Sequence, residues 1–355
     1  MTSKELIERR LTSQLLQDHS FHTPEQIVSW FGAIQSQDYA GAVWAISQRL
    51  PSISNYEIES AYNKGLLLRI HMMRPTWHFV APEDIRWILA LTKDRVIRTM
   101  STYNKSLGLT DTQFKKSLAI IQNELKGHNY MTRNELGDLL KRNGISWQGN
   151  GLAHLVMYVE ENGIICSGPK KGKQHTYALL SERVPHVKPM SRDDALKELT
   201  KKYFQSHGPA QISDFVWWSG LVTSDVKKGI SLLNDLRSDV VEGKTYYYFD
   251  TPFHKRTTKI CLLPNYDEYT VAYTDREVLT QNVDKSKLDF RQNSLFNNVI
   301  LIDGKIEGLW RRTLKTNSVH VETRLFKTLN SDEKKELSTS LQEYADFLHL
   351  KLIHE

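Results

Sequence analysis

The chain has 355 residues, a length that predicts two or three domains and makes a single core improbable. Its composition, with 40% hydrophobic and 25% charged residues, is that of a folded globular protein and excludes a largely disordered one. The formal net charge of +6 favours a polyanionic partner, but 41 acidic residues nearly balance 47 basic ones. We therefore expect the basic surface to be local.

The two cysteines and the amino terminus indicate the compartment. Cys166 and Cys261 lie far apart, with no histidine or cysteine at metal-ligand spacing, so we expect reduced core thiols and neither a disulfide framework nor a zinc site. The segment from Met1 to Arg10 is charged and lacks the apolar stretch of a secretory signal. We expect a monomeric cytoplasmic protein, associated with the nucleoid, that needs no membrane, metal or cofactor.

Residues 1–115 predict a first module of three helices and a hairpin. Pro24 suits a first helical turn, a second helix covers Tyr39–Gln48, and Asn55 is a candidate cap for the third. The hairpin strands are expected at Leu66–His71 and Thr76–Val80, after which Pro82 opens another helix.

Residues 116–190 show the same order more clearly. Thr132 is expected to cap a helix that ends near Arg142, and a second helix spans Gln148–Asn162. Two short strands, Ile164–Cys166 and Thr176–Leu180, are expected to flank a lysine-rich loop. Helix, turn, helix and basic hairpin is the order of a winged helix.

The pattern returns in residues 191–254, although few residues are identical between the copies. An amphipathic helix covers Leu196–Ser206, Ser213 is a candidate cap for the next helix, and a third begins near Thr223. The strand Thr245–Phe249 completes a hairpin.

Residues 255–355 differ from the rest in predicting mainly strands. Asp303-Gly304 is a strong hairpin turn, and a helix capped by Ser331 closes the chain. The overall prediction is an α+β, mainly helical fold with three tandem winged-helix modules and a carboxy-terminal β-rich domain with a terminal helix. The strands of that domain are expected at Lys259–Leu263, Asn298–Ile302, Lys305–Thr313 and Ser318–Phe326.

The usual enzyme signatures, such as a phosphate-binding loop or a zinc-protease motif, are missing, and the unusual local feature is Gln35-Ser36-Gln37. If the chain is extended there, both glutamine amides project the same way. An amide offers a donor and an acceptor, so a pair can hold one water molecule without carrying charge. The simpler alternative, which the sequence alone favours, is that both amides satisfy backbone groups at an interhelical turn.

Three segments are informative together: Gln35-Ser36-Gln37, the stretch from Arg69 to His78, and the pair Leu263–Tyr269 with Ile302–Arg312. With them, the chain resembles the AlkZ/YcaQ family of winged-helix DNA glycosylases over essentially its whole length. The resemblance implies three winged helices and a β-rich domain around a basic channel for duplex DNA. It also implies hydrolysis of the N-glycosidic bond of N7-alkylated purines or of bulky, crosslinked guanine adducts.

The family's catalytic element is a Gln-x-Gln or Gln-x-Asp motif, which Gln35 and Gln37 match. We assign Gln37 to positioning the water and Gln35 to a supporting contact. The residue between them is expected to be aliphatic, and Ser36 departs from that pattern, which places activity in question more than the fold. Asp38 is a candidate helper, with a helix cap as the favoured alternative, and His78 is a second candidate.

Cations and one aromatic residue are the candidates for DNA contact. Arg69 and Arg74 flank the first hairpin, and three lysines lie on the second, with ordinary ion pairing or solvation as the alternative. Asp267 and Glu268 are expected to be structural and to pair with arginines. The remaining candidates for DNA contact are Lys170, Lys171, Lys173, Trp310, Arg311 and Arg312, with core packing as the alternative for Trp310.

The leading hypothesis is a DNA-repair glycosylase that binds damaged duplex DNA with little sequence preference. A non-catalytic DNA-binding protein, such as a transcription or nucleoid factor, is the second hypothesis, and specificity for a palindromic site would favour it. A protein-interaction scaffold is the third, and DNA binding that is weak and independent of salt would support it.

Overall fold

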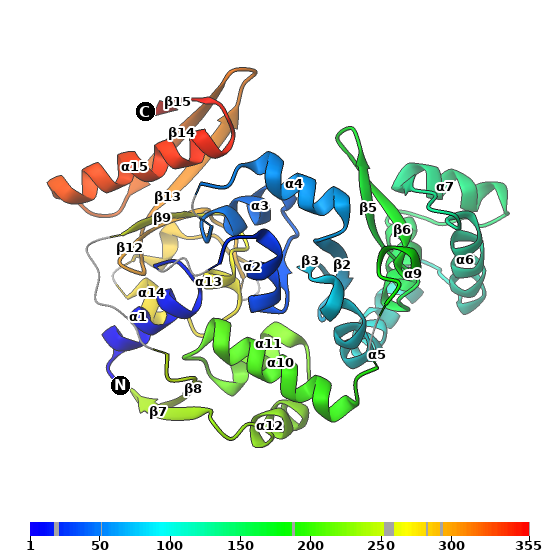
Figure 1. Cartoon of the computed structure of the whole chain (residues 1–355), viewed down its shortest axis with the longest axis horizontal. Helices are drawn as coiled ribbons and strands as arrows, with labels where there is room; N and C mark the ends of the chain where they lie inside the picture. The colour runs from blue at the N-terminus through cyan, green and yellow to red at the C-terminus, as the bar shows by residue number, and fades with distance from the viewer. Residues whose placement is uncertain are drawn as a thin grey trace.

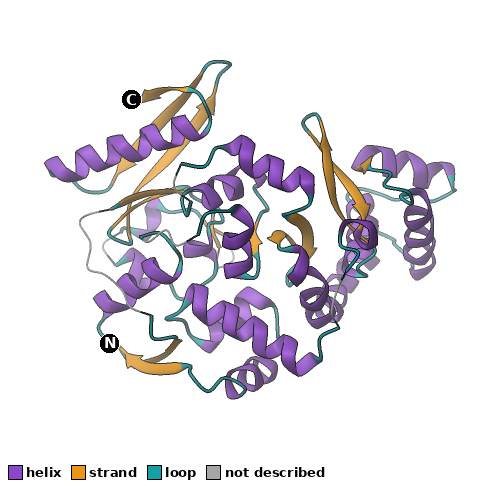
Figure 2. Ribbon diagram, viewed as in Figure 1, coloured by secondary structure: helices purple, strands orange, loops and turns teal. Residues whose placement is uncertain are grey.

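The computed structural model describes residues 1–17, 21–50, 52–186, 189–251, 259–281, 283–291 and 294–354. Figure 2 shows helices throughout the molecule, with the strands of the described residues gathered in five separate sheets. Across these ranges, no helix combines the length and the apolar character needed to cross a lipid bilayer.

The first region contains a three-stranded antiparallel sheet in the order β1-β3-β2, covered by helices. A reciprocal cap between Thr23 and Gln26 begins α2, and one between Ser54 and Glu57 begins α4, so the cap of α4 lies one residue before the expected Asn55. The elements are α2 (Pro24–Phe31), β1 (Ile34–Gln35), α3 (Tyr39–Ser47), α4 (Asn55–Lys64), β2 (Leu68–Met72), β3 (Thr76–Val80) and α5 (Pro82–Ser106).

The second region repeats this order, with a sheet in the order β4-β6-β5. Thr132 caps α7 as expected. The lysine-rich loop expected between the two strands is much shorter, because β5 continues through Pro169 to Lys171. The Thr176 hydroxyl donates to the Pro169 carbonyl, and the pairing of β5 with β6 shifts register between Gly168 and Lys171. The elements are α6 (Asp111–Glu124), β4 (Met131–Thr132), α7 (Arg133–Arg142), α8 (Gly151–Glu161), β5 (Ile165–Lys171), β6 (Gln174–Leu179) and α9 (Leu180–Arg183).

The third region has the same order, with a single bridge from Ala210 to Tyr247 at the place of the short first strand. Helix α11 begins before the expected cap at Ser213, because Gln211 and Asp214 cap each other reciprocally. The elements are α10 (Arg192–His207), α11 (Ile212–Ser219), α12 (Thr223–Ser231), β7 (Arg237–Val241) and β8 (Lys244–Tyr248).

The last region is built on a five-stranded sheet in the order β15-β14-β13-β12-β9, in which β15 runs parallel to β14. The expected turn at Asp303-Gly304 joins β12 to β13, and both residues have positive φ. The elements are β9 (Ile260–Leu263), α13 (Glu268–Val271), α14 (Glu277–Thr280), a 3-10 turn (Lys285–Lys287), β10 (Phe290–Arg291), β11 (Ser294–Leu295), β12 (Val299–Ile302), β13 (Lys305–Leu314), β14 (Ser318–Leu325), α15 (Ser331–Phe347) and β15 (Lys351–His354).

The amino-terminal helix α1 (Ser3–Ser13) places its apolar side chains in the core of this last region, and its contact with the first region includes a hydrogen bond from the Trp30 indole N–H to the Ser13 carbonyl. Leu6 and Leu11 of α1 share a core with Cys261 and Leu301 of the five-stranded sheet. The expected boundary at 254/255 lies outside the described residues.

Shared cores join the regions into one body (Figure 1). Trp44 of α3 packs against Tyr344 of α15, and Ile70 of β2 shares a core with Tyr203 and Phe215 of the third region. The short segment after β1 therefore lies where the first, third and last regions meet.

Candidate active site

The Gln35-Ser36-Gln37 segment begins in β1 and follows β3 for one residue beyond it, so the condition under which both amides could project the same way, a non-helical chain, is met. Gln35 pairs with His78, and the Ser36 backbone nitrogen donates to the Trp77 carbonyl over 2.7 Å. Gln35 is buried, whereas Gln37 is exposed. We call residues 35–37 the glutamine loop.

Both glutamine amides are oriented by a donor at their oxygen. Trp77 donates its backbone N–H to Gln37 Oε1 over 3.2 Å, and Arg74 Nη2 donates to Gln35 Oε1 over 2.7 Å. Within the described part of the chain, neither Nε2 group has a hydrogen-bond partner. Each amide can therefore still donate, and each oxygen keeps a second lone pair.

Arg69 fixes the centre of the loop. Its Nη2 donates to the Ser36 carbonyl over 2.9 Å, and its Nε lies 3.4 Å from Ser36 Oγ. The Ser36 hydroxyl therefore has a polar partner, which explains how a polar residue fits a buried position. The Arg69 guanidinium lies 4.3 Å from the centre of the Trp77 ring, and burial lowers its pKa. Arg69 is 7% exposed, and the polar contact that the structure describes for it at this site is with the loop.

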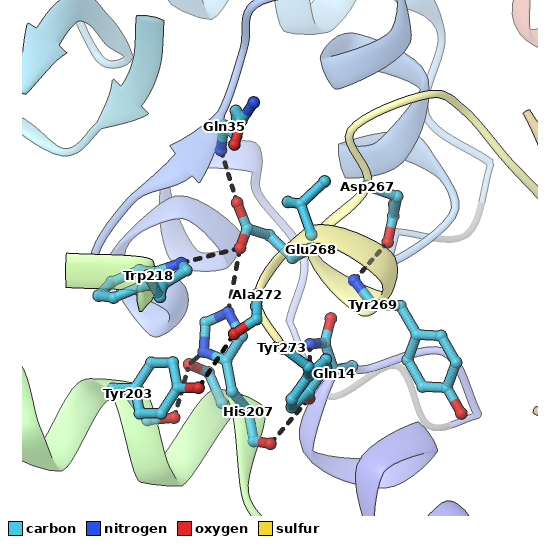
Figure 3. Close-up of polar contacts among 12 residues, drawn as sticks. Gln14, Gln35, Tyr203, His207, Trp218, Asp267, Glu268, Tyr269, Ala272 and Tyr273 are labelled. Carbon is cyan, nitrogen blue, oxygen red and sulfur yellow. Dashed lines mark hydrogen bonds and ion pairs between the residues drawn. The ribbon is translucent and has the colours of Figure 1, made fainter. Parts of the chain in front are cut away.

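A buried carboxylate lies directly behind the loop (Figure 3). Glu268 of α13 accepts the Gln35 backbone N–H over 2.6 Å, the Trp218 indole N–H over 2.9 Å and a hydrogen bond from His207 Nε2 over 3.2 Å. Burial acts to raise the pKa of Glu268, but the hydrogen bonds from His207 and Gln35 outweigh it and hold the pKa below its ordinary value. Glu268 is therefore ionised at neutral pH.

His207 resembles the middle member of a hydrolytic triad but is not placed to act as one. Its Nδ1 lies 2.8 Å from Ser206 Oγ and its Nε2 faces Glu268, while its ring stacks on Tyr203. Ser206 and His207 are both 0% exposed, so the hydroxyl cannot reach a macromolecular substrate. Because an ionised Glu268 only accepts hydrogen bonds, His207 Nε2 carries a proton.

The two accessory candidates are both engaged in the fold. His78 is 0% exposed, and its Nδ1 lies 3.0 Å from the Thr76 carbonyl. Burial, with Arg74 nearby, lowers the pKa of His78 to about 3, so the ring is neutral at physiological pH. Asp38 caps α3 by accepting the Gly41 N–H over 3.1 Å, and one of its oxygens lies 3.7 Å from Arg312.

Two further DNA-contact candidates face the interior. Trp310 is 1% exposed, packs against Tyr344 and donates its indole N–H to the Leu263 carbonyl, so the expected channel position is corrected to a core position. Arg74 holds Gln35 and lies 5.3 Å from the centre of the Trp217 ring, which makes it a loop contact as well.

The other cations lie nearer the surface. Lys171, Lys173 and Arg311 are exposed, although Lys171 pairs with Glu135 over 3.2 Å. Lys170 is mostly covered and pairs with Glu59 over 2.6 Å. Arg312 lies 3.7 Å from Asp38, the residue that follows the glutamine loop.

A cleft of about 470 Å³ lies between the β2–β3 and β5–β6 hairpins. It extends from Trp77, whose backbone holds Gln37, to Lys173, and includes His175, Arg69 and Arg133. Among the described residues that line it, none is a carboxylate. The cleft thus offers positive charge and aromatic surface next to the exposed glutamine.

Three residues that complete the site, Glu268, His207 and Trp218, lacked a functional prediction. The signal that pointed to this area was the acidic pair in the Leu263–Tyr269 stretch, which we expected to pair with arginines. That is confirmed for Asp267, which accepts two 2.9 Å hydrogen bonds from Arg49. It is wrong for Glu268, whose hydrogen bonds come from the loop backbone, an indole and an imidazole.

Two of three comparisons with known proteins find a match. The model of a family described as AlkZ-like DNA glycosylases matches residues 28–347. A solved structure, the DNA glycosylase AlkZ of Streptomyces sahachiroi, is similar over 100% of both chains, with a TM-score of 0.80 and 19% sequence identity, which establishes the likeness of the fold. A comparison with curated proteins finds no match.

Proposed function

Because the chain belongs to the AlkZ-like DNA glycosylases, we propose that its substrate is an N7-alkylated purine, including bulky or crosslinked guanine adducts, in duplex DNA. The chain is a DNA glycosylase, a hydrolase of DNA repair, and DNA is its partner. The proposal concerns the lesion and the residues that act on it.

The observation that carries the proposal is the state of the Gln37 amide. It is exposed, its oxygen is held by the Trp77 N–H, and its Nε2 donors have no partner within the described residues. An amide oriented in this way can hold a water oxygen at one fixed place. Gln35, with its oxygen held by Arg74, supplies a second oriented donor behind it.

The chemistry suits a lesion that already carries positive charge. When the C1′–N9 bond breaks, its electron pair neutralises the cationic base, so no general acid is needed. The water oxygen then bonds to C1′ of the oxocarbenium-like sugar and loses its proton to solvent. A neutral, buried His78 and a capping Asp38 fit this requirement, because neither has to protonate the base. Two amides are weak bases, so stable, uncharged nucleosides should not be substrates.

We further propose that the repeated order of elements represents three winged-helix modules, 1–115, 116–190 and 191–254, followed by a β-rich domain, 255–355. Helix α1 then belongs in space to the β-rich domain. Exposed Lys171, Lys173 and Arg311 would contact phosphates and contribute affinity without reading sequence. The cleft that holds Lys173 would lie along the DNA path.

The test is single-turnover release of N7-methylguanine from a duplex, read as strand scission after alkaline work-up. We expect Gln37→Ala to slow release about 100-fold or more, because an oriented hydrogen-bonding group is lost from the transition state. Gln35→Ala should slow it less. Gln342→Ala, an exposed glutamine on α15, is the matched control and should behave as the wild type. A wild-type rate in Gln37→Ala would contradict the assignment.

A further inference from the structure

We propose that Glu268 is a positioning residue, through which the carboxy-terminal region sets the conformation of the glutamine loop. This inference rests on the proposed role of Gln35 and Gln37. Glu268 is 1% exposed, and its contact with the loop is the hydrogen bond from the Gln35 backbone N–H.

The hydrogen bonds of Glu268, which lies in the last region, join it to the first and the third region (Figure 3). Oε1 accepts the Gln35 N–H over 2.6 Å, and Oε2 accepts from Trp218 Nε1 and His207 Nε2 over 2.9 and 3.2 Å. Gln35 lies 233 residues before Glu268 in sequence, while His207 and Trp218 belong to the third region. One buried carboxylate therefore ties the loop to two other regions.

The position requires a group that only accepts hydrogen bonds. Gln35 offers an N–H to one oxygen, and Trp218 with His207 offers N–H groups to the other. A glutamine at position 268 would have one oxygen and one NH2 group, so either orientation sets an NH2 against an N–H. That residue would leave a buried donor unsatisfied beside the loop, which costs more than the loss of one hydrogen bond.

Glu268 completes a clamp on both ends of Gln35. Arg74 holds the side-chain oxygen and Glu268 holds the backbone nitrogen, so the amide plane and the chain direction are set together. The other described hydrogen bonds to the loop come from Trp77 and Arg69, on the hairpin of the same region. Glu268 is thus the contact that makes the loop geometry depend on the assembled protein.

The neighbouring carboxylate provides a matched control. Asp267 is as buried as Glu268 and lies at the start of the same short helix, but it pairs with Arg49 and, within the described ranges, makes no hydrogen bond to the glutamine loop. Removal of either charge should lower stability, since both leave buried partners unpaired. Only the change at Glu268 should alter the loop.

The experiment compares full-length Glu268→Gln and Asp267→Asn with the wild type. The three measurements are affinity for an undamaged duplex, single-turnover release of N7-methylguanine, and hydrogen exchange of the loop peptide. We expect Glu268→Gln to bind DNA within about twofold of wild type but to release the base about 10- to 100-fold more slowly, as for a small displacement of a reacting group. Hydrogen exchange of the loop peptide should be about tenfold faster in Glu268→Gln. Asp267→Asn should change neither the rate of base release nor the rate of loop exchange.

The proposal is overturned if the two variants lose activity equally, or if Glu268→Gln keeps wild-type rate and exchange. If the wild type releases nothing from this duplex, the proposed substrate is wrong, and loop exchange alone then decides the role of Glu268. If Glu268→Gln does not fold, Trp218→Phe removes one donor to the carboxylate without touching Gln35. We expect it to slow release about threefold and to speed loop exchange, and a folded Trp218→Phe with wild-type values for both would overturn the proposal.

Discussion

The β2–β3 and β5–β6 hairpins occupy the same place in two repeated units, yet they use their cations in opposite ways. Arg69 on β2 is 7% exposed and donates to the Ser36 carbonyl, and Arg74 at the turn donates to Gln35. Lys171 on β5 has a side chain that is 51% exposed, and Lys173 is exposed at the tip.

The difference is one of burial. The first hairpin packs between the third region and α5, so its arginines satisfy buried carbonyl and amide oxygens. The β5–β6 hairpin projects away from the first hairpin (Figure 1), and Lys173 at its tip is exposed and lines the cleft. Cations in equivalent hairpins thus hold the glutamine loop in one case and lie exposed in the other, where we propose that they meet DNA.

The largest expected effect comes from a break in the buried arrangement. Arg69→Met keeps an unbranched apolar stem but removes the guanidinium, which leaves the Ser36 carbonyl and hydroxyl without their donor. Since the loop then loses its central anchor, we expect release of N7-methylguanine to fall about 100-fold. Single-turnover assays check this against Lys171→Met on the other hairpin, which should keep the wild-type rate at saturating enzyme. Equal losses in both variants would show that the two hairpins do not differ in role.

The second largest effect is a loss of stability at acid pH, which should be greater for the histidine of the first hairpin than for that of the second. Burial lowers the pKa of His78 on β3 to about 3 and that of His175 on β6 to about 4, from an ordinary 6.5. Below pH 6.5, the ordinary pKa of histidine, these two residues therefore bind more protons in the unfolded chain than in the folded one. The free energy of unfolding that is present at neutral pH is lost as the pH falls from 6.5 toward the folded pKa values. For fully buried His78 the loss is about 1.4 kcal/mol per pH unit, and it should be smaller for His175, which is partly solvated.

Denaturant unfolding between about pH 5 and pH 7 measures these losses. His78→Gln should flatten the decline of the unfolding free energy by about 2 kcal/mol at the acid end, and His175→Gln should flatten it less. A decline as steep as that of the wild type in His78→Gln would mean that the ring is not held neutral in the fold.

The smallest effect concerns DNA affinity. We expect Lys171→Ala combined with Lys173→Ala to lower the slope of log affinity against log salt by between about 1 and 2, because each lost phosphate contact removes about 0.9. Affinity at moderate salt should fall about tenfold, with the release rate at saturating enzyme unchanged. Binding titrations at several salt concentrations provide the measurement.

Lys170→Ala is the matched control for that double variant. Lys170 lies on the same strand, but its side chain is 13% exposed and its ammonium pairs with Glu59 over 2.6 Å. The salt slope should therefore change by less than about 0.5. A larger change at Lys170 than at the exposed pair would contradict the assignment of DNA contacts by exposure.

Local patterns in the sequence predicted much of the fold, because caps and turns act over a few residues. The Thr132 cap, the Asp303-Gly304 turn and the strand from Thr76 to Val80 are confirmed. The errors were also local in origin. Ser213 was predicted to cap α11, whereas the cap is Gln211, two residues earlier, with Asp214 as its reciprocal partner.

The sequence by itself also singled out Gln35 and Gln37 as an unusual pair and, through its resemblance, indicated the family to which the chain belongs. Only the tertiary structure decided which partners hold that segment. Arg69 and Trp310 became interior residues, and Glu268 came to lie behind a loop 233 residues away in sequence. The physical reason is that burial and hydrogen-bond partners depend on how separate regions pack, and no short-range pattern carries that information.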